Sequence, residues 1–438
     1  MKQHLKQPFP PLAGLKTFLI VWSTQNLSTL GSAMTSFALV VWSYQQQGSA
    51  LTTALLSVCS YVPYVALSIF AGSLGDRWDK RRTMAMCDTF AALTTLAVLA
   101  LLKTGQLALW HLYLLNALNG LMNAVQYPVS EVVVTLLTPK DQVQRVSGLL
   151  SLSQSLTTLL SPVLATALLG LLGLEAVIVF DLATCAAAVG TLLWGVEFPE
   201  TPPAEKVPLT RSAGEGVRWL LNQRGVLDLI LFLACINLIA SMYNAALPAM
   251  VLSRPGGGET ALGLVEAATG LAHLAGSLLV TALPQPRSRV RVICNCLLVS
   301  MSTENLLLAL GRGTGIWCFG AVLGWLLIPM MQANMSALLR LRIPVEMQAR
   351  VYAARNTLQF FTIPLGYLLG GWLVDRVCEP LMARLGPDAA LTALLGSGKG
   401  SGAALLFLAI AFAGVAVCLL FRRDRHLWSL EEQDRSAS

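Results

Sequence analysis

The chain has 438 residues, of which 55% are hydrophobic and only 12% are charged, and its formal net charge is +7. An ordinary soluble domain carries about 25% charged residues, so this composition cannot cover a soluble core of this size. It excludes a soluble enzyme, a secreted disulfide-bonded protein, a disordered chain and a nucleic-acid-binding protein, and it predicts an all-α membrane protein.

Apolar stretches of about 20 residues, long enough to cross a hydrocarbon core of ~30 Å, recur along almost the whole chain. The first stretch is too long for the core of a signal peptide and carries Gln25 and Asn26, so we expect it to remain as a spanning helix. We predict about twelve crossings, at residues 15–44, 51–74, 83–102, 107–127, 146–169, 174–195, 226–252, 261–283, 290–310, 314–338, 351–374 and 403–421.

The basic residues are distributed unevenly between the two sides of the predicted membrane. If successive loops are assigned to alternate sides, 24 of the 30 Lys and Arg residues fall on the side that holds both termini. The positive-inside rule then predicts a multi-pass protein of the plasma (cytoplasmic) membrane with both termini in the cytoplasm. The nine Cys residues are mostly scattered within apolar stretches, so we expect no disulfide and no metal site.

The loop between the second and third crossings, residues 72–82, combines glycines with acidic and basic residues. Gly72 and Gly75 would let two helices approach closely. Asp76 ends the second helix at the membrane surface, where it can pair with the basic cluster or with a helix amino terminus. Such a contact can form in one conformation and break in another. In the alternative interpretation, Asp76 only offsets the positive charge of an ordinary cytoplasmic loop.

This loop resembles the signature loop of the major facilitator superfamily. Its Asp-Arg-x-Asp-(Lys/Arg)-Arg form, with Asp79 where the general motif has Gly, is similar to the macrolide-efflux and siderophore-exporter branch of drug:proton antiporters. The resemblance implies a fold of two pseudo-symmetric six-helix bundles. It also implies a cytoplasmic gate latch made by Gly72, Gly75, Asp76, Arg77, Asp79 and Arg81. The fourth crossing lacks the Arg that antiporters of this superfamily commonly carry, which leaves proton coupling open.

An internal repeat divides the chain. Residues 139–146 and 344–351 share Pro, an acid, Arg and Val at the same spacing, and residues 71–74 recur as 275–278. Two matches at equivalent loops indicate six helices duplicated in parallel, as in the two halves of major facilitator transporters. A polar, Pro-rich stretch then separates the halves. We expect an N-terminal six-helix bundle at 1–196, a cytoplasmic linker with an interfacial helix at 197–225, and a C-terminal six-helix bundle at 226–438.

Polar side chains within the crossings are expensive in a bilayer and tend to be functional. The fourth crossing carries four amides at positions i, i+3, i+7 and i+10, which share one helix face. If the superfamily arrangement holds, helices one, four, seven and ten line a central cavity. The four amides of the fourth crossing would then form an uncharged polar wall. We expect a substrate cavity lined by Gln25, Asn26, Asn116, Asn119, Asn123, Gln126, Asn237 and Asn244. Alternatively, the amides cross-link neighbouring helices, for about 0.6–2 kcal/mol each.

The eighth crossing carries Glu266 and His273, seven residues apart and therefore nearly on one helix face. An acid in apolar surroundings can exchange a proton when a cation or a ligand approaches. We interpret this pair as a candidate for proton coupling or for recognition of a cationic substrate. The alternatives are a structural hydrogen-bonded pair, or a Glu266 that is simply hydrated near the outer mouth.

The sequence contains no nucleotide-binding Gly-Lys-Ser/Thr loop, no His-Glu-x-x-His and no Gly-x-Ser-x-Gly, so we expect no enzyme and no cofactor. We predict a monomeric secondary transporter that exports a hydrophobic or amphiphilic small molecule, drug- or siderophore-like, by alternating access in exchange for protons. The alternatives are a lysophospholipid flippase or an uptake carrier on the same fold, or a non-transporting receptor.

Overall fold

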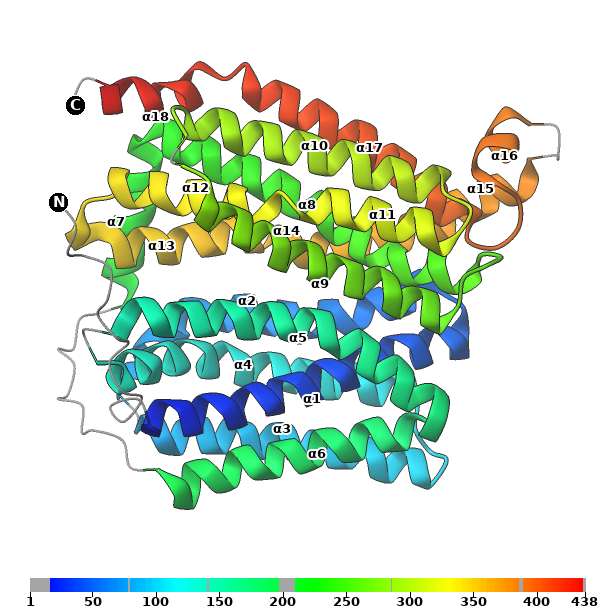
Figure 1. Ribbon diagram of the computed structural model, residues 1–438, viewed down its shortest axis with the longest axis horizontal. Coiled ribbons are helices and arrows are strands. Elements are labelled where there is room, and N and C mark those ends of the chain that lie inside the picture. Colours follow the sequence, from blue (N-terminus) through cyan, green and yellow to red (C-terminus); the bar gives the residue numbers. More distant parts are fainter. Residues whose placement is uncertain are drawn as a thin grey trace, which may run out of the picture.

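The computed structural model describes residues 16–77, 79–139, 142–196, 209–284, 286–385 and 389–435. Within these ranges the regular secondary structure is helical throughout. The long helices run side by side along the longest axis of the molecule, and α1 (Lys16–Gln47) begins at the same end at which α18 (Arg425–Arg435) lies (Figure 1). We call this end of the bundle the linker end and the opposite end the far end.

The first six crossings form one group of helices, drawn in blue to green in the lower half of Figure 1. After α1 they are α2 (Ala50–Arg77), α3 (Lys80–Lys103), α4 (Leu109–Leu137), α5 (Val143–Leu172) and α6 (Leu174–Gly190), which η3 (Thr191–Gly195) extends. The predicted sixth crossing, 174–195, has the bounds of α6 and η3 together. α4 is longer than predicted: it continues past Pro128, which lies inside the helix. Proline is tolerated in spanning helices because neighbouring helices and side chains satisfy the freed backbone groups.

The remaining crossings form a second group, drawn from green to red in the upper half of Figure 1. Two of its crossings are divided into consecutive helices, and Pro329 lies in the first turn of one such segment. The bounds are α8 (Arg224–Ser253), α9 (Glu259–Ala282), α10 (Arg289–Leu310), α11 (Thr314–Trp325) with α12 (Ile328–Arg342), α13 (Val345–Phe360) with α14 (Thr362–Leu373) and η4 (Val374–Cys378), and α17 (Ser401–Arg422).

Ten helical segments of the described chain are long and apolar enough to cross a membrane. α1 and α4 are not among them, although they contain 32 and 29 residues. These two helices carry most of the amide side chains singled out from the sequence, and amides lower the hydropathy of a helix. The prediction of an all-α membrane protein is confirmed. The two long helices that are less apolar than the rest, α1 and α4, both belong to the first group.

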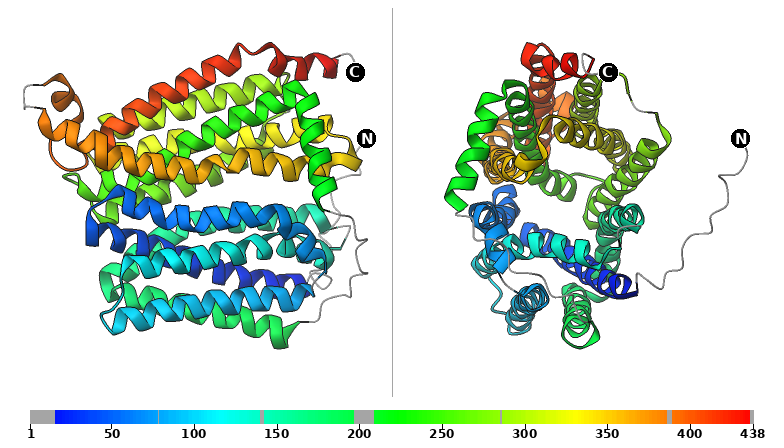
Figure 2. Two further views of the ribbon diagram at one scale, coloured as in Figure 1. Left: turned by 180° about the vertical axis from the view of Figure 1, so that it is seen from behind. Right: turned by 90° about the vertical axis from the view of Figure 1, so that its left-hand side faces the viewer.

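Shorter helices lie at the two ends of the bundle. At the linker end, α7 (Leu209–Asn222) connects the two groups (Figure 2), and its Leu220 side chain is buried. At the far end, the stretch between the predicted crossings 351–374 and 403–421 contains α15 (Glu379–Arg384) and α16 (Ala390–Leu395). Arg254 holds this segment, because it donates hydrogen bonds to the carbonyl oxygens of Leu395 and, at 3.0 Å, of Gly311.

The two groups of helices meet mainly where α2 packs on α14 and where α5 packs on α9. All four helices lie in the middle of Figure 1. Glycine permits both contacts. A Cβ atom at Gly270 would lie 2.6 Å from the backbone nitrogen of Leu159, and one at Gly371 would lie 2.6 Å from the Cα atom of Leu51. Small residues at such crossings let helix backbones pack closely within a bilayer.

Candidate functional site

A cavity of about 540 Å³ lies within the first group of helices, between the middle of the bundle and the linker end. This volume falls in the range of about 300–1,000 Å³ that is usual for small-molecule sites. Its polar lining residues are Gln25, Asn26, Ser28, Thr29, Ser32, Ser36, Asp88, Asn123, Gln126 and Ser130. Its aromatic lining residues are Phe18, Trp22, Tyr64 and Tyr127.

Asp88 of α3 is the feature of this cavity that the sequence analysis missed. Its side chain is only 6% exposed, and both carboxyl oxygens accept hydrogen bonds. The Gln25 Nε2 atom donates to Oδ2 at 2.7 Å, and the Gln126 Nε2 atom donates to Oδ1 at 2.5 Å. The cavity therefore contains a carboxyl group beside the amide side chains that the sequence predicts. The available signal was an acid inside the third predicted crossing, where ionisable residues are rare.

The four amides of α4 do not act as one surface. Asn123 and Gln126 line the cavity. Asn119 lies nearer the far end and accepts a hydrogen bond from the Thr94 hydroxyl of α3 at 3.0 Å, while Asn116 donates to a carbonyl oxygen of its own helix at 2.8 Å. Asn119 thus cross-links two helices, which is the alternative that the sequence left open. A shared helix face does not place all its residues at the same depth in the bundle.

The two amides predicted on the seventh crossing lie in α8, outside the described lining of this cavity. The Asn237 Nδ2 atom donates to the carbonyl oxygen of Gln359 at 3.2 Å, so it joins α8 to the end of α13. The side chain of Asn244 is exposed. The described lining residues come from α1 to α6 alone, and a substrate contact by either amide stays a prediction.

Glu266 and His273 both lie on α9, and both side chains are half-buried. Two helical turns separate residues that are seven apart, which is about 10 Å along the axis. The described structure accordingly contains no ion pair between them. The His273 ring lies 6.5 Å from the ring of Trp325 instead. A role for this pair in proton coupling or substrate recognition stays a prediction.

The predicted gate latch is described in part. The backbone of Gly72, Gly75, Asp76 and Arg77 belongs to α2, and the side chains of Asp76 and Arg77 lie outside the described structure. Asp79 caps α3, because its carboxylate accepts a hydrogen bond from the Arg82 backbone nitrogen at 2.7 Å. Arg81 donates to the carbonyl oxygens of Leu192 and Leu193 in η3, within the same group of helices. These two residues thus stabilise local helix ends, and the latch itself stays a prediction.

A polar contact between the two groups, which the sequence does not predict, lies at the far end. The Asp375 carboxylate of η4 accepts a hydrogen bond from the Ser49 hydroxyl at 2.6 Å. It also accepts from the backbone nitrogens of Ala50 and Leu51 at 3.0 and 2.9 Å. A carboxylate at a helix amino terminus gains both hydrogen bonds and a favourable interaction with the helix dipole. We call Ser49, Ala50, Leu51 and Asp375 the far-end clasp.

The far end of α1 extends this connection. The Tyr44 hydroxyl lies 2.5 Å from the Ser253 hydroxyl and donates to the Ala249 carbonyl oxygen at 3.2 Å. Next to it, the Gln45 amide donates to the carboxylate of Glu259. Polar contacts therefore hold the two groups together at the far end, while the cavity lies toward the linker end.

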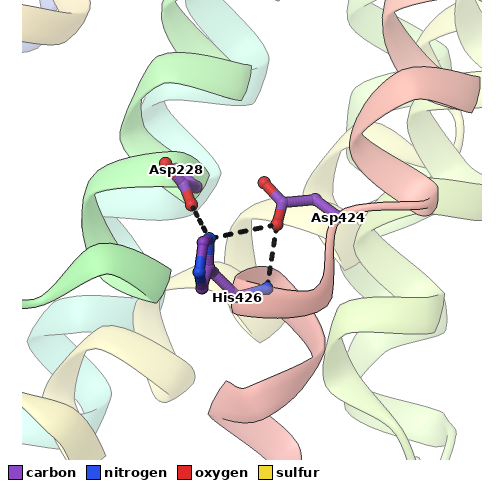
Figure 3. A group of neighbouring side chains, drawn as sticks. All are labelled: Asp228, Asp424 and His426. Atoms are coloured by element: carbon purple, nitrogen blue, oxygen red, sulfur yellow. Dashed lines mark hydrogen bonds and ion pairs between the residues drawn. The ribbon is translucent and has the colours of Figure 1, made fainter.

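A separate cluster of titratable residues lies at the linker end and joins α18 to α8 (Figure 3). The His426 Nδ1 atom lies 3.3 Å from an Asp228 oxygen and 3.6 Å from an Asp424 oxygen. One potential ligand atom from each residue fits within 4.8 Å, so these are the described residues that could hold a metal ion. Ion pairing of a protonated imidazole with two carboxylates accounts equally for the arrangement, and it docks the C-terminal helix.

Comparison with known proteins identifies the family. Residues 21–367 match the family model of the Major Facilitator Superfamily. Macrolide efflux protein A of Streptococcus pyogenes is 23% identical over 367 residues, which cover 82% of this chain and 90% of that protein. A nucleoside transporter has a TM-score of 0.66 at 13% identity, with 92% of this chain and 99% of that chain covered. A bacterial homologue of the iron transporter ferroportin, in an inward-facing state, has a TM-score of 0.65 at 13% identity, with 95% and 100% covered.

The two solved structures share the fold of this chain, and the family match spans most of its length. This confirms the resemblance that was drawn from residues 72–82. The chain belongs to the Major Facilitator Superfamily, and it is a multi-pass secondary transporter of small molecules rather than an enzyme.

Proposed function

We propose that the protein exports a hydrophobic or amphiphilic small molecule, drug- or siderophore-like, by alternating access in exchange for protons. One observation carries the proposal: a polar cavity lies toward the linker end while the far-end clasp holds the opposite end together. This is the arrangement that a carrier needs in order to load substrate from one side. The similarity to a macrolide efflux protein favours export.

The direction of loading depends on the orientation of the bundle in the membrane. By the sequence assignment, 24 of the 30 Lys and Arg residues fall on the side that holds both termini, and the described helices α1 and α18 place this side at the linker end. The positive-inside rule then puts the linker end in the cytoplasm of the cell. The bundle then spans the plasma membrane, with both termini and the cavity on the cytoplasmic side. An exporter takes its substrate from this side.

Alternating access requires two bodies that move against each other. We propose residues 1–196 and 226–438 as these bodies, with the linker 197–225 between them and the monomer as the working unit. The contacts of α2 with α14 and of α5 with α9 are the surfaces that would slide or separate. Closing the linker end would require the far-end clasp to open.

The direct test uses the purified protein in liposomes with an imposed pH gradient, and measures efflux of several lipophilic dyes and antibiotics. We expect gradient-dependent flux of at least some of them. Unchanged flux after the gradient is collapsed would reject proton exchange. A fluorescent lysophospholipid in the same assay tests the flippase alternative, and its gradient-independent movement in place of drug flux would replace the export proposal.

Replacing Glu266 with Gln should remove the candidate proton carrier while keeping the size of the side chain. We expect gradient-driven flux to fall by at least about tenfold, because an amide cannot carry a proton between the two sides. Downhill flux without a gradient should persist. The Glu175→Gln variant is the control, since Glu175 is an exposed residue near the far end that pairs with Lys103 at 3.9 Å. Wild-type flux in Glu266→Gln would remove Glu266 from the mechanism.

Replacing Asp76 with Asn tests the latch that the signature loop implies. Loss of the charge should weaken a contact formed only when the linker end is closed. We therefore expect a slower turnover, by about five- to tenfold, with the affinity for substrate unchanged. Initial rates of flux measured over a range of substrate concentrations separate the two quantities. A parallel loss of affinity and turnover would argue that Asp76 does not act as a latch.

A further inference from the structure

Asp88 connects three helices at the wall of the cavity. It lies on α3, and its two amide partners come from α1 and α4. Because both carboxyl oxygens accept hydrogen bonds from amide nitrogens, the geometry suits the ionised carboxylate, which has acceptors only. The two glutamines therefore fix the orientation of a negative charge that borders the cavity.

This carboxylate lacks a positive partner among the described residues of the cavity. None of the described lining residues is Lys, Arg or His. Arg81, at the start of the same helix, donates to the carbonyl oxygens of Leu192 and Leu193. Amide donors orient a carboxylate but do not neutralise it, and a buried charge is costly unless a counter-charge is supplied. A cation that enters the cavity would supply it.

The rest of the wall suits the remainder of such a ligand. Trp22, Tyr64 and Tyr127 line the same cavity as Asp88, together with Phe18 and Met84. Aromatic faces attract cations electrostatically and also pack against apolar surfaces. The Tyr127 side chain is 62% exposed, so its ring is accessible for contact. The volume of about 540 Å³ admits a drug-sized molecule.

We propose that Asp88, held by Gln25 and Gln126, binds the cationic group of an amphiphilic substrate whose apolar body packs on the aromatic side chains of the cavity. This inference rests on the proposed export function, since it names the chemical class of the substrate. It places the recognition of positive charge in the first group of helices, on α3, and not at Glu266 of α9.

The test measures binding to the purified full-length protein by equilibrium dialysis, with tetraphenylphosphonium as the cation and triphenylphosphine oxide as a neutral probe. We expect the wild-type protein to prefer the cation. Asp88→Asn should weaken binding of the cation by about ten- to a hundredfold, because the Coulomb attraction between the carboxylate and the phosphonium charge is lost. Its affinity for the neutral probe should stay within about twofold. Equal affinity of the wild type and Asp88→Asn for the cation would overturn the proposal.

A second variant keeps the test decisive if Asp88→Asn disturbs the fold. Gln126→Lys places an ammonium group beside the carboxylate, so it should block the cation while Asp88 is still present. Glu175→Gln removes an exposed negative charge far from the cavity and should bind both probes like the wild type. Undiminished binding of the cation to Gln126→Lys, in a protein that elutes as a single species, would also overturn the assignment.

The outcome for export is read separately in liposomes. If the wild type moves no dye or antibiotic but binds the cation through Asp88, the export proposal fails and the binding site stands. If transport proceeds and Asp88→Asn transports and binds cations like the wild type, export stands and the site fails.

Discussion

Replacing Gly371 with Leu should prevent the far end from closing and reduce transport by at least about tenfold. A Cβ atom at this position would lie 2.6 Å from the Cα atom and 3.0 Å from the nitrogen of Leu51, and backbone atoms cannot rotate away as a flexible side chain can. Overpacking of this kind costs about 1–3 kcal/mol. This cost arises only when α14 and α2 are in contact. The equilibrium between conformations with a closed and with a separated far end should therefore shift by about 5- to 150-fold toward the separated ones.

The shift can be measured by the reactivity of a single engineered cysteine near the far end, for example Thr52→Cys. The nine native cysteines are first replaced. A membrane-impermeant maleimide should then label Gly371→Leu faster than the parent. Gly315→Leu is the matched control: Gly315 also lies in a helix near the far end, but a Cβ atom added there would meet no other atom within 4 Å. Labelling and transport at the parental rate in Gly371→Leu would contradict the proposed motion.

The sequence predicts the helices well because each crossing is a long apolar stretch bordered by polar or basic loops. The prediction is least accurate where a residue type is compatible with both a helix and a helix end. Proline often ends a helix, yet α4 continues through Pro128 to Leu137, because the surrounding helices satisfy the backbone groups that the proline leaves unpaired. The stretch after Asp375 likewise contains short helices, α15 and α16, whose stability depends on contacts with distant residues such as Arg254.

The candidate site is predicted only in part, for a related reason. Helical periodicity identifies a shared face, and so Gln126 and Asn123 of α4 were found. Periodicity does not show how deep in the bundle a residue lies or which side chains it contacts. Asn119, which accepts a hydrogen bond from Thr94 of α3, is therefore grouped with them from the sequence alone. Asp88 has a local signal, since it is an acid inside a predicted crossing, but its partners, like those of Asp375, come from other helices. Such pairings are properties of the tertiary structure and leave no local pattern in the sequence.

The far-end clasp offers the complementary experiment to Gly371→Leu, because it removes an attraction without adding a clash. Asp375→Asn takes away the negative charge at the amino terminus of α2, where the carboxylate accepts hydrogen bonds from the Ala50 and Leu51 nitrogens at 3.0 and 2.9 Å. Hydrogen bonds to a charged group contribute about 1.5–3 kcal/mol each, so the closed far end should lose a substantial part of its stability. We expect faster maleimide labelling at Thr52→Cys and a transport rate reduced by about tenfold or more.

A graded series distinguishes the clasp from a general loss of stability. Ser49→Ala removes one of the three hydrogen bonds to the Asp375 carboxylate, at 2.6 Å, together with the bonds that the Ser49 hydroxyl accepts within α2 from the Thr52 backbone nitrogen and hydroxyl at 3.1 and 3.0 Å. It leaves both backbone contacts of Asp375, so it should open the far end less than Asp375→Asn does. If both Gly371→Leu and Asp375→Asn act by separating α2 from α14, the double variant should show less than the sum of the two effects, because a contact already broken cannot be lost again. Fully additive effects would place Gly371 and Asp375 in independent structural roles. An Asp375→Asn protein with parental labelling and transport would show that the clasp does not hold the far end closed.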